Sequence, residues 1–360
     1  MLTSRQRLLT ILRHQIPDRY PWAPLLDGYF MQGLPPEQEA AGIPAFLRSI
    51  EADILLRHVP CWRVEYDGVG VTEAKTGRGT ARAIETPLGK LTERSEHHPG
   101  AETAYVTEYY IKTPDDYAAA GYWLTHQRPT PDYAATQRVM DEAGEEGLVT
   151  VNAGSPPLTA FFRFLPQEQV SFEFYDHPER LDKLAEAAHA FTFAQAQVAA
   201  ASPAEVVVAY AADITTRLVS PKMFERYALP FLQETARVLH AAGKVFVLHT
   251  CGDVAALLPM MRRSGIDAID SLSEPPLGNT PFEAAMAELG DGVCLIGGVS
   301  PVVLANGTPD DVRAHVLDLF GRVPSPRNLL LCTSDATAYA TPVENLRAVS
   351  QLVREYPLGC

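Results

Sequence analysis

The sequence predicts a single α/β domain over residues 1–360, built as a (β/α)8 TIM barrel. Short, nearly continuous apolar runs rich in β-branched residues recur along the chain, as parallel strands buried on both faces require. Helical stretches separate most of these runs, and the runs number eight, which favours a closed barrel. A doubly wound open sheet is the competing architecture, but no Gly-x-Gly-x-x-Gly follows the first strand to support it.

The strands and helices can be placed in order along the chain. Ser220-Pro221, Thr308-Pro309 and Thr341-Pro342 each carry the start signal of a helix, and Gly243 is the stop signal of the first of these helices. The eight expected strands span residues 19–26, 52–60, 148–155, 206–214, 244–253, 268–273, 294–301 and 328–336.

The segment 62–111 differs from the rest of the chain. It alternates polar and apolar residues and contains the turn Pro87-Leu88-Gly89, so we expect a β-rich hairpin or small sheet, inserted between the second and third strands of the barrel. A lid over the site is an alternative role for this insertion. The stretch 112–146 is expected to be helical.

Composition and charge exclude several classes of function. The formal net charge of −14 argues against broad nucleic-acid binding, which needs Lys and Arg to displace counterions. No apolar stretch reaches the roughly 18 residues that a membrane helix needs. The start of the sequence lacks a long apolar core and a small-residue cleavage site, so no secretory signal is predicted and a cytoplasmic location is the default.

Five cysteines occur, and a disulfide framework is not expected in a long chain without a secretory signal. Cys294 lies inside an expected strand, which favours a packed thiol. Cys61 and Cys360 show no partner pattern.

His249, Cys251 and Cys332 are the strongest candidates for chemistry. His249 and Cys251 lie two residues apart in the strand 244–253, so both side chains point to one face. They stand at the C-terminal end of that strand, where the active sites of barrels lie, and Cys332 is close to the C-terminal end of the last strand. A lone His-x-Cys is a weak signal, but three soft ligands at strand ends predict a zinc site with an exchangeable fourth position, as in catalytic zinc.

Other polar residues stand at expected strand ends. Glu274 is either a fourth zinc ligand or a solvated carboxylate before Pro275-Pro276, and the two readings stay open. Asp213 is assigned as the catalytic residue, binding substrate or donating a proton; its structural alternative is to cap the following turn. The residues assigned to substrate binding are Asn152, Tyr210 and Asp335.

A zinc site with two thiolates and a neutral imidazole has no formal charge. Such a site is a mild Lewis acid, which activates a thiol as a nucleophile or stabilises an oxygen or sulfur leaving group.

At these residues the sequence resembles the uroporphyrinogen decarboxylase superfamily, and within it the zinc-dependent, cobamide-linked methyltransferases. The resemblance covers nearly the whole chain and agrees with a (β/α)8 barrel. It is carried by the opening SRQRLLTILRHQIPDRYPWAP, by TPLGKL (86–91), YYIKTPDDY (109–117), DITTRLVSPKMFERYALP (213–230), LHTCGDV (248–254), GIDAIDSLS (265–273), GGVSP (297–301) and TPVENL (341–346).

The resemblance implies a function. Its methyltransferase branch has a His-x-Cys and a distant Cys as zinc ligands, which His249, Cys251 and Cys332 match. A more distant similarity to cobalamin-independent methionine synthase, whose ligand set includes a Glu after the next strand, favours Glu274. The expected reaction moves a methyl group between a small O- or S-methyl compound and the cobalt of a separate corrinoid protein. The direction of transfer and a homodimer are left open, and O-demethylation of a methoxylated aromatic is favoured only because this branch includes such enzymes.

Two alternatives remain. The decarboxylase branch has an Arg-rich segment near the first strand that grips porphyrin carboxylates, whereas no arginine lies between Tyr20 and Phe30 here. A metal-free decarboxylase would rely on Asp213 and use the cysteines for packing. A protein that binds zinc or a thiol without catalysis is the other alternative.

Overall fold

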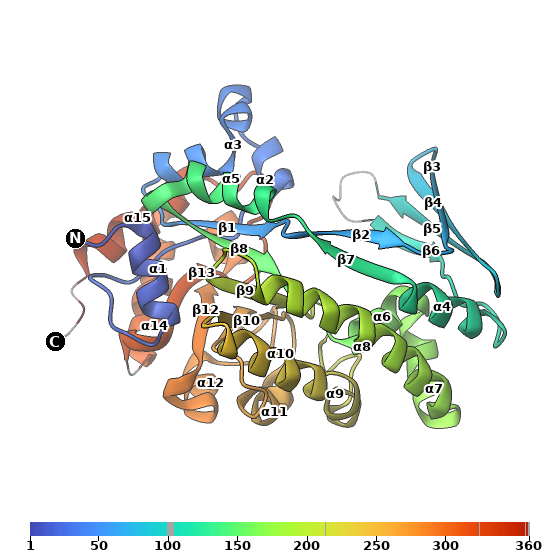
Figure 1. Ribbon diagram of the computed structural model, residues 1–360. Helices are drawn as coiled ribbons and strands as arrows, with labels where there is room; N and C mark the ends of the chain where they lie inside the picture. The colour runs from blue at the N-terminus through green and yellow to red at the C-terminus, as the bar shows by residue number, and fades with distance from the viewer. Residues whose placement is uncertain (99–103, 213, 324, 357, 359–360) are drawn as a thin grey trace.

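A parallel sheet of seven strands, curled around an interior, forms the centre of the computed structural model (Figure 1), which describes the whole chain except residues 99–103, 213, 324, 357 and 359–360. The α/β class is therefore confirmed. The strands follow in the order β1 (Ile54–Val59), β8 (Gly147–Asn152), β9 (Val206–Tyr210), β10 (Val245–His249), β11 (Ala268–Leu272), β12 (Cys294–Val299) and β13 (Leu329–Thr333).

The first expected strand, residues 19–26, forms only one isolated parallel bridge, between Trp22 and Leu331 of β13. On its other side, the carbonyl oxygen of Trp22 accepts a hydrogen bond of 2.7 Å from the backbone N–H of Asp53, just before β1. Pro21 and Pro24 flank the bridge and donate no backbone hydrogen bond, so the pairing cannot extend. The eight-stranded barrel consequently stays a prediction.

Helices cover the outer face of the sheet (Figure 1). The side chains of Ser220 and Thr308 accept hydrogen bonds from the N–H groups of Met223 and Asp311, which confirms both start signals. The helices are α1 (Ser4–Leu12), α2 (Gly28–Gln32), α3 (Pro36–Ser49), α4 (Asp116–Thr125), α5 (Tyr133–Ala143), α6 (Pro157–Phe164), α7 (Gln167–Asp176), α8 (Pro178–Ala200), α9 (Pro221–Tyr227), α10 (Leu229–Ala241), α11 (Leu258–Arg262), α12 (Phe282–Leu289), α13 (Pro301–Asn306), α14 (Pro309–Arg322) and α15 (Val343–Glu355).

A second, antiparallel sheet stands away from the parallel one, at the far end of the long ribbon that β1 and β2 make together (Figure 1). Its strands are β3 (Gly70–Thr76), β4 (Gly79–Thr86), β5 (Gly89–His97) and β6 (Ala104–Glu108), while β2 (Trp62–Tyr66) pairs with β7 (Gln127–Pro131). The stretch 112–146 is thus not wholly helical. Pro129 and Pro131 explain the difference, because proline in a helix interior removes a hydrogen bond and clashes with the preceding turn.

Alternate residues of the parallel strands fill the interior. One end is apolar and is closed by Leu8, Ile11 and Leu12 of α1, which pack in one cluster with the inward side chains of the sheet. Cys294 lies fully buried in this cluster, as a packed thiol. On β1, β9, β10 and β11, the next inward side chain after the apolar cluster is polar. These side chains lie toward the C-terminal ends of the strands, where the active sites of barrels lie. These residues are Arg57, Tyr210, His249 and Asp270.

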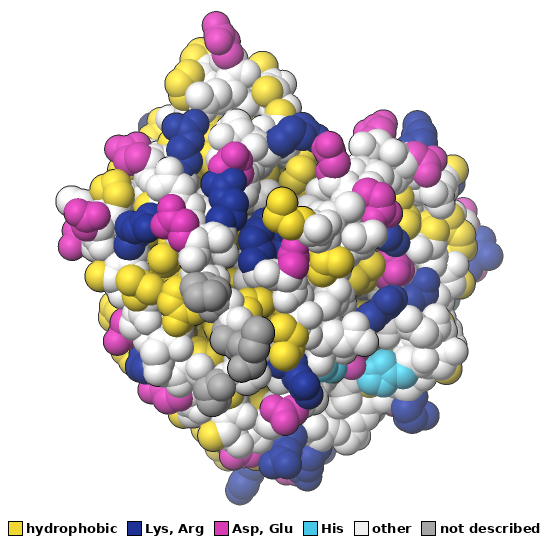
Figure 2. Space-filling model, turned by 90° about the vertical axis from the view of Figure 1, so that its left-hand side faces the viewer, with side chains coloured by type: hydrophobic (Ala, Val, Ile, Leu, Met, Phe, Trp, Pro, Cys, Tyr) yellow, Lys and Arg dark blue, Asp and Glu magenta, His cyan; other side chains and the backbone are white. Residues whose placement is uncertain are grey.

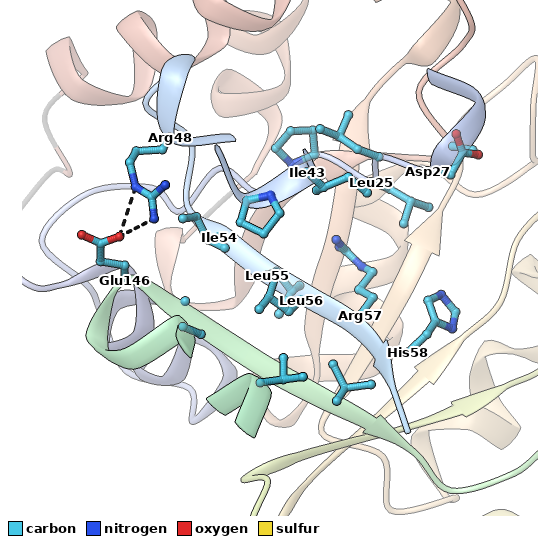
Figure 3. A pocket seen from close by; sticks show the side chains of 18 of the residues that line it. Leu25, Asp27, Ile43, Arg48, Ile54, Leu55, Leu56, Arg57, His58 and Glu146 are labelled. Atoms are coloured by element: carbon cyan, nitrogen blue, oxygen red, sulfur yellow. Dashed lines mark hydrogen bonds and ion pairs between the residues drawn. The ribbon is translucent and has the colours of Figure 1, made fainter. Parts of the chain in front are cut away.

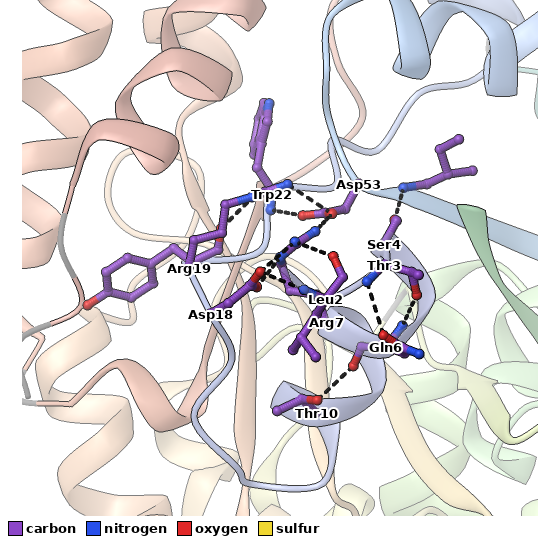
Figure 4. Close-up of polar contacts among 12 residues, drawn as sticks. Leu2, Thr3, Ser4, Gln6, Arg7, Thr10, Asp18, Arg19, Trp22 and Asp53 are labelled. Carbon is purple, nitrogen blue, oxygen red and sulfur yellow. Dashed lines mark hydrogen bonds and ion pairs between the residues drawn. The ribbon is translucent and has the colours of Figure 1, made fainter. Parts of the chain in front are cut away.

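A buried ionic cluster ties α1, the Trp22 segment and β1 together near the opposite end (Figure 4). The Asp53 carboxylate accepts hydrogen bonds from Arg7 at 2.6 Å, from Arg19 at 3.1 Å and from the Trp22 backbone N–H at 3.0 Å. Arg7 also donates to Asp18 at 2.7 Å. Because the Asp53 side chain is only 1% exposed, these donors take the place of water around its carboxylate.

Acidic and basic side chains intermingle on the face beside the N-terminus, which Figure 2 shows. Within the part of the chain that the structure describes, none of the helices has the length and apolarity to cross a membrane.

Candidate active site

A chain of polar contacts crosses the interior at the C-terminal ends of the strands. His249 at the end of β10 pairs in register with Asp270 of β11, and Nδ1 of His249 lies 2.9 Å from Oδ2 of Asp270. Arg57 of β1 lies 3.8 Å from Oδ1 of Asp270 and donates to Sγ of Cys332 at 3.3 Å. The structure therefore links His249 and Cys332, from strands that are not neighbours, through Asp270 and Arg57.

Burial and the neighbouring charges together set the pKa values of Asp270 and Cys332. Burial alone would raise the pKa of the Asp270 carboxyl, but Arg57 and the hydrogen bond from His249 outweigh it and hold that pKa below its usual range. An ionised carboxylate accepts hydrogen bonds only, so Nδ1 of His249 is the donor, and in a neutral imidazole the lone pair is then on Nε2. Burial raises the pKa of the Cys332 thiol to about 11, with Arg57 opposing it, so Cys332 is a thiol in the absence of a further cation.

A bulge in β1 places a second histidine beside this group. The register of β1 against β8 shifts between Leu56 and Val59, and His58 adopts a φ of 61°, which is uncommon for a residue with a side chain. The His58 ring stacks on Tyr210 with centroids 4.4 Å apart, and a hydrogen bond of 3.2 Å joins Nε2 to the Tyr210 hydroxyl. Burial is the main cause that lowers the pKa of His58 and raises that of Tyr210.

The three expected zinc ligands stand at one end of the sheet, but they are not assembled. His249 closes β10, Cys332 lies fully buried in β13, and Sγ of Cys251 donates to the carbonyl oxygen of Ala212 at 3.3 Å. Among the described residues, no three His, Cys, Asp or Glu side chains are grouped closely enough to hold a metal ion. Asp213, the expected catalytic residue, lies outside the described residues.

Glu274 lies in a different environment. Arg322 of α14 donates to both carboxylate oxygens, at 2.8 and 3.0 Å, and the N–H of Phe282 donates at 3.2 Å. Both oxygens thus accept hydrogen bonds from α14 or from the start of α12. In this structure Glu274 is a loop carboxylate that links two helices, and its reading as a fourth zinc ligand stays a prediction.

The expected substrate-binding residues are separated. Tyr210 faces the His249 group, with the ring centroids 5.2 Å apart. Asp335 lines the cavity described next. Asn152 turns the chain after β8, because its Oδ1 accepts from the N–H of Gly154 at 2.5 Å, and it lines a different cavity, of about 330 Å³.

A cavity of about 880 Å³ opens from the His249 group along β1 (Figure 3). Arg57 and His58 lie at one end and the ion pair of Arg48 with Glu146 lies at the other, with Leu55 and its neighbours between them. The volume falls in the range of about 300–1,000 Å³ that is typical of small-molecule sites.

Arg57, His58 and Asp270 were missed by the reasoning from sequence. A signal for two of them was present: Arg57 and Asp270 each interrupt a short apolar run that was assigned to a buried strand. A charge in such a run must face a partner in the interior, because an unpaired buried charge is costly. His58 gave no comparable signal, since its orientation depends on the bulge.

Comparisons with known proteins agree with this architecture. The model of the family described as uroporphyrinogen decarboxylase (URO-D) matches residues 98–356. A methylated-thiol–coenzyme M methyltransferase of Methanosarcina mazei is 25% identical over 182 residues, which are 50% of this chain and 46% of that protein. A methylcobamide:CoM methyltransferase of Methanosarcina barkeri is 29% identical over 216 residues, or 59% of this chain and 57% of that protein. The chain thus spans about half the length of the curated relatives it matches.

A solved structure extends the likeness to the full chain. A methyltransferase from Methanosarcina mazei covers 99% of this chain and 99% of its own, with a TM-score of 0.63 and 17% sequence identity. At that identity the likeness shows a shared fold. Together with the curated relatives, the family match confirms the resemblance that the motifs indicated.

Proposed function

The chain belongs to the uroporphyrinogen decarboxylase family, and we propose that it is a methyltransferase that moves a methyl group between the cobalt of a corrinoid protein and a small thiol or ether. The relatives described above, which are named as methyltransferases for methylcobamide or coenzyme M, support this reaction class. Asp213 stays the candidate proton donor, and a separate corrinoid protein is the proposed partner.

The observation that carries the proposal is the hydrogen bond between His249 and Asp270. A carboxylate on Nδ1 fixes the ring and its tautomer, and leaves Nε2 as a ligand atom. Histidines that bind zinc almost always have their second nitrogen held in this way. The carboxylate in turn lies 3.8 Å from the Arg57 guanidinium group, and both of these side chains are buried.

We propose that His249, Cys251 and Cys332 hold a zinc ion. The donor set fits, because one oriented imidazole and two thiols are ligands that zinc prefers. Zinc binding would replace the contact of Cys251 with Ala212 and that of Cys332 with Arg57. Zinc would supply a Lewis acid that favours the thiolate form of a bound thiol or withdraws charge from a leaving oxygen or sulfur.

The methyl transfer itself balances without a further reactant. When a thiol is the acceptor, the cobalt–carbon bond breaks and a sulfur–carbon bond forms, so methyl-cobalt(III) and the thiol give a methyl thioether, cobalt(I) and a proton. Tyr210, beside His249, is placed to contact the reactant. The same atoms run in reverse when an O- or S-methyl compound, such as a methoxylated aromatic, is the donor.

The activity can be measured with free methylcobalamin as the cobalt methyl donor. We expect purified protein to contain about one zinc per chain and to convert methylcobalamin and benzyl mercaptan to cob(I)alamin and the thioether, followed by absorbance under anaerobic conditions. Removal of zinc by a chelator should abolish the reaction, and zinc but not magnesium should restore it. Equal activity of metal-free and zinc-loaded protein would refute the zinc site. For the reverse direction, cob(I)alamin is mixed with 2-methoxyphenol, and methylcobalamin formation indicates an aryl ether donor.

Asp270→Asn tests the role of the hydrogen bond between His249 and Asp270. The neutral amide keeps the size of the side chain but holds the imidazole more weakly, so we expect zinc affinity and methyl transfer to fall by about 10–100-fold. Zinc affinity is measured by competition with a chromophoric chelator, a quantity that a purely structural role would leave unchanged. Asp267→Asn is the matched control, since Asp267 bonds His240 outside the site at 3.0 Å. Unchanged zinc affinity in Asp270→Asn contradicts the assignment.

Metal-free decarboxylation is the second candidate, favoured by the description of the family. The large cavity argues against a polycarboxylate substrate, because the carboxylates of Asp27, Glu142, Glu146 and Asp335 line it and only two guanidinium groups do. The zinc determination separates the two candidates, since the decarboxylase needs no metal ion.

A further inference from the structure

The large cavity exists because β1 has no strand partner along most of one side. β1 ends the sheet, and along the described backbone on that side a single backbone–backbone hydrogen bond, from Asp53 just before β1, reaches Trp22. Beyond Trp22 the chain departs toward α2 instead of following β1, and the space between the two is the cavity. It reaches from His249 past the whole length of β1 to α3 and α5.

The walls of this cavity are mainly apolar. Leu25 and Leu26 come from the segment after Trp22, Ile43 from α3, Leu56 from β1 and Val139 from α5. At about 880 Å³ the cavity is much larger than a two-carbon thiol needs, and an apolar body that filled it would gain the free energy of leaving water.

The two arginines in the cavity lining already have partners, and further carboxylates of the lining add negative charge. Arg57 faces Asp270 and Cys332, and Arg48 donates to Glu146 at 2.6 Å. Each guanidinium group in the lining therefore has a partner, while Glu142 and Asp335 add negative charge. A ligand that carries an anionic group would meet like charges here and would have to break an ion pair to gain a cation.

We propose that this cavity binds the uncharged, apolar body of the methyl donor or acceptor, with the heteroatom that carries the methyl group at the His249 end. The inference rests on the proposed methyl transfer and names its substrate class. That class differs from coenzyme M, the thiol in the names of the relatives, because coenzyme M carries a sulfonate.

Measurements of ligand binding test the inference without requiring catalytic turnover. Benzyl methyl sulfide and 2-(methylthio)ethanesulfonate are titrated into the full chain by calorimetry, and we expect the neutral thioether to bind at least about tenfold more tightly. Val139→Phe places a larger side chain in the wall and should weaken benzyl methyl sulfide about tenfold, roughly the cost of two buried methylene groups. Ala134→Phe is the matched control, because Ala134 is exposed on the same helix and does not line the cavity. Ile43→Phe repeats the test from α3 if Val139→Phe does not fold.

The outcomes separate this inference from the proposed function. Tighter binding of the sulfonate, no detectable binding of the neutral thioether, or equal loss in Val139→Phe and Ala134→Phe overturns the inference, whatever the activity. Binding of the neutral thioether that Val139→Phe weakens and Ala134→Phe leaves intact supports it. If that pattern holds and no methyl group is transferred to any thiol, the proposed reaction is wrong and the apolar ligand class stands.

Discussion

Replacing Cys332 by alanine should remove zinc and methyl transfer and leave the fold intact. Sγ is the only zinc donor that β13 contributes to the proposed site, so the loss should exceed the about 10–100-fold that removing an outer partner costs. Alanine keeps the residue apolar and small, and the neighbouring Arg57 retains Asp270 as its counter-charge. Zinc content by mass spectrometry of the metal, methylcobalamin turnover and a thermal unfolding curve are measured on the same preparation.

Cys294→Ala is the matched control for this variant. Cys294 is also a fully buried thiol on the inner face, in the neighbouring strand β12, but it lies at the apolar end, and burial raises its pKa to about 12. We expect it to keep zinc and activity and to lose about as much stability as Cys332→Ala. If Cys332→Ala retains wild-type turnover, or if only that variant unfolds, Cys332 is a packing residue and not a ligand.

Replacing Asp53 by alanine should lower the free energy of unfolding by about 3–5 kcal/mol, as is usual when one partner of a buried ionic group is removed. Arg7 and Arg19 would then be left in the interior without their shared carboxylate (Figure 4). The Trp22 N–H would lose its acceptor as well, so the link between α1, β13 and β1 weakens at one point. Urea unfolding of both proteins, compared at equal slope, gives the difference.

Lys90→Ala serves as the control for Asp53→Ala. Lys90 pairs with Glu85 at 2.9 Å on the antiparallel sheet, and both side chains are more than half exposed. Exposed pairs contribute little, so a change within about 0.5 kcal/mol is expected. A loss in Asp53→Ala no larger than in Lys90→Ala would show that the buried cluster does not stabilise the fold.

The fold could be predicted where local patterns decide the structure. Seven of the eight expected strands are present, because a short apolar run between helices has one stable place, a parallel sheet covered by helices. The exception is the run around Trp22, where apolar character was right but two prolines removed the donors that a ladder needs. β7 was missed for the converse reason: its residues read as part of a helical stretch, and its partner β2 lies far away in the sequence.

The site could be predicted only in part. Residue types show which side chains can act as ligands, whereas the orientation of each side chain depends on its hydrogen-bond partners in the fold. His249 and Cys332 stand at strand ends as expected, but Asp270, which fixes the imidazole, was read only as part of a strand. Glu274 also follows a strand end, and its hydrogen bonds with Arg322 of the distant α14 could not be predicted from the local sequence. Pairings of that kind join residues far apart along the chain, and no local pattern records them.

The single bridge at Trp22 has a further consequence for how the two reactants of the proposed transfer would reach the site. A displacement at a methyl carbon requires the incoming and departing atoms on opposite sides of that carbon. A cobalt macrocycle is too broad to share a narrow passage with the other reactant. In the proposed reaction, the cavity beside β1 would admit the small molecule, and the corrinoid protein would approach at the C-terminal ends of the strands. Pro21 and Pro24, which limit the pairing at Trp22, would thus give the two reactants of the proposed transfer separate routes to the site.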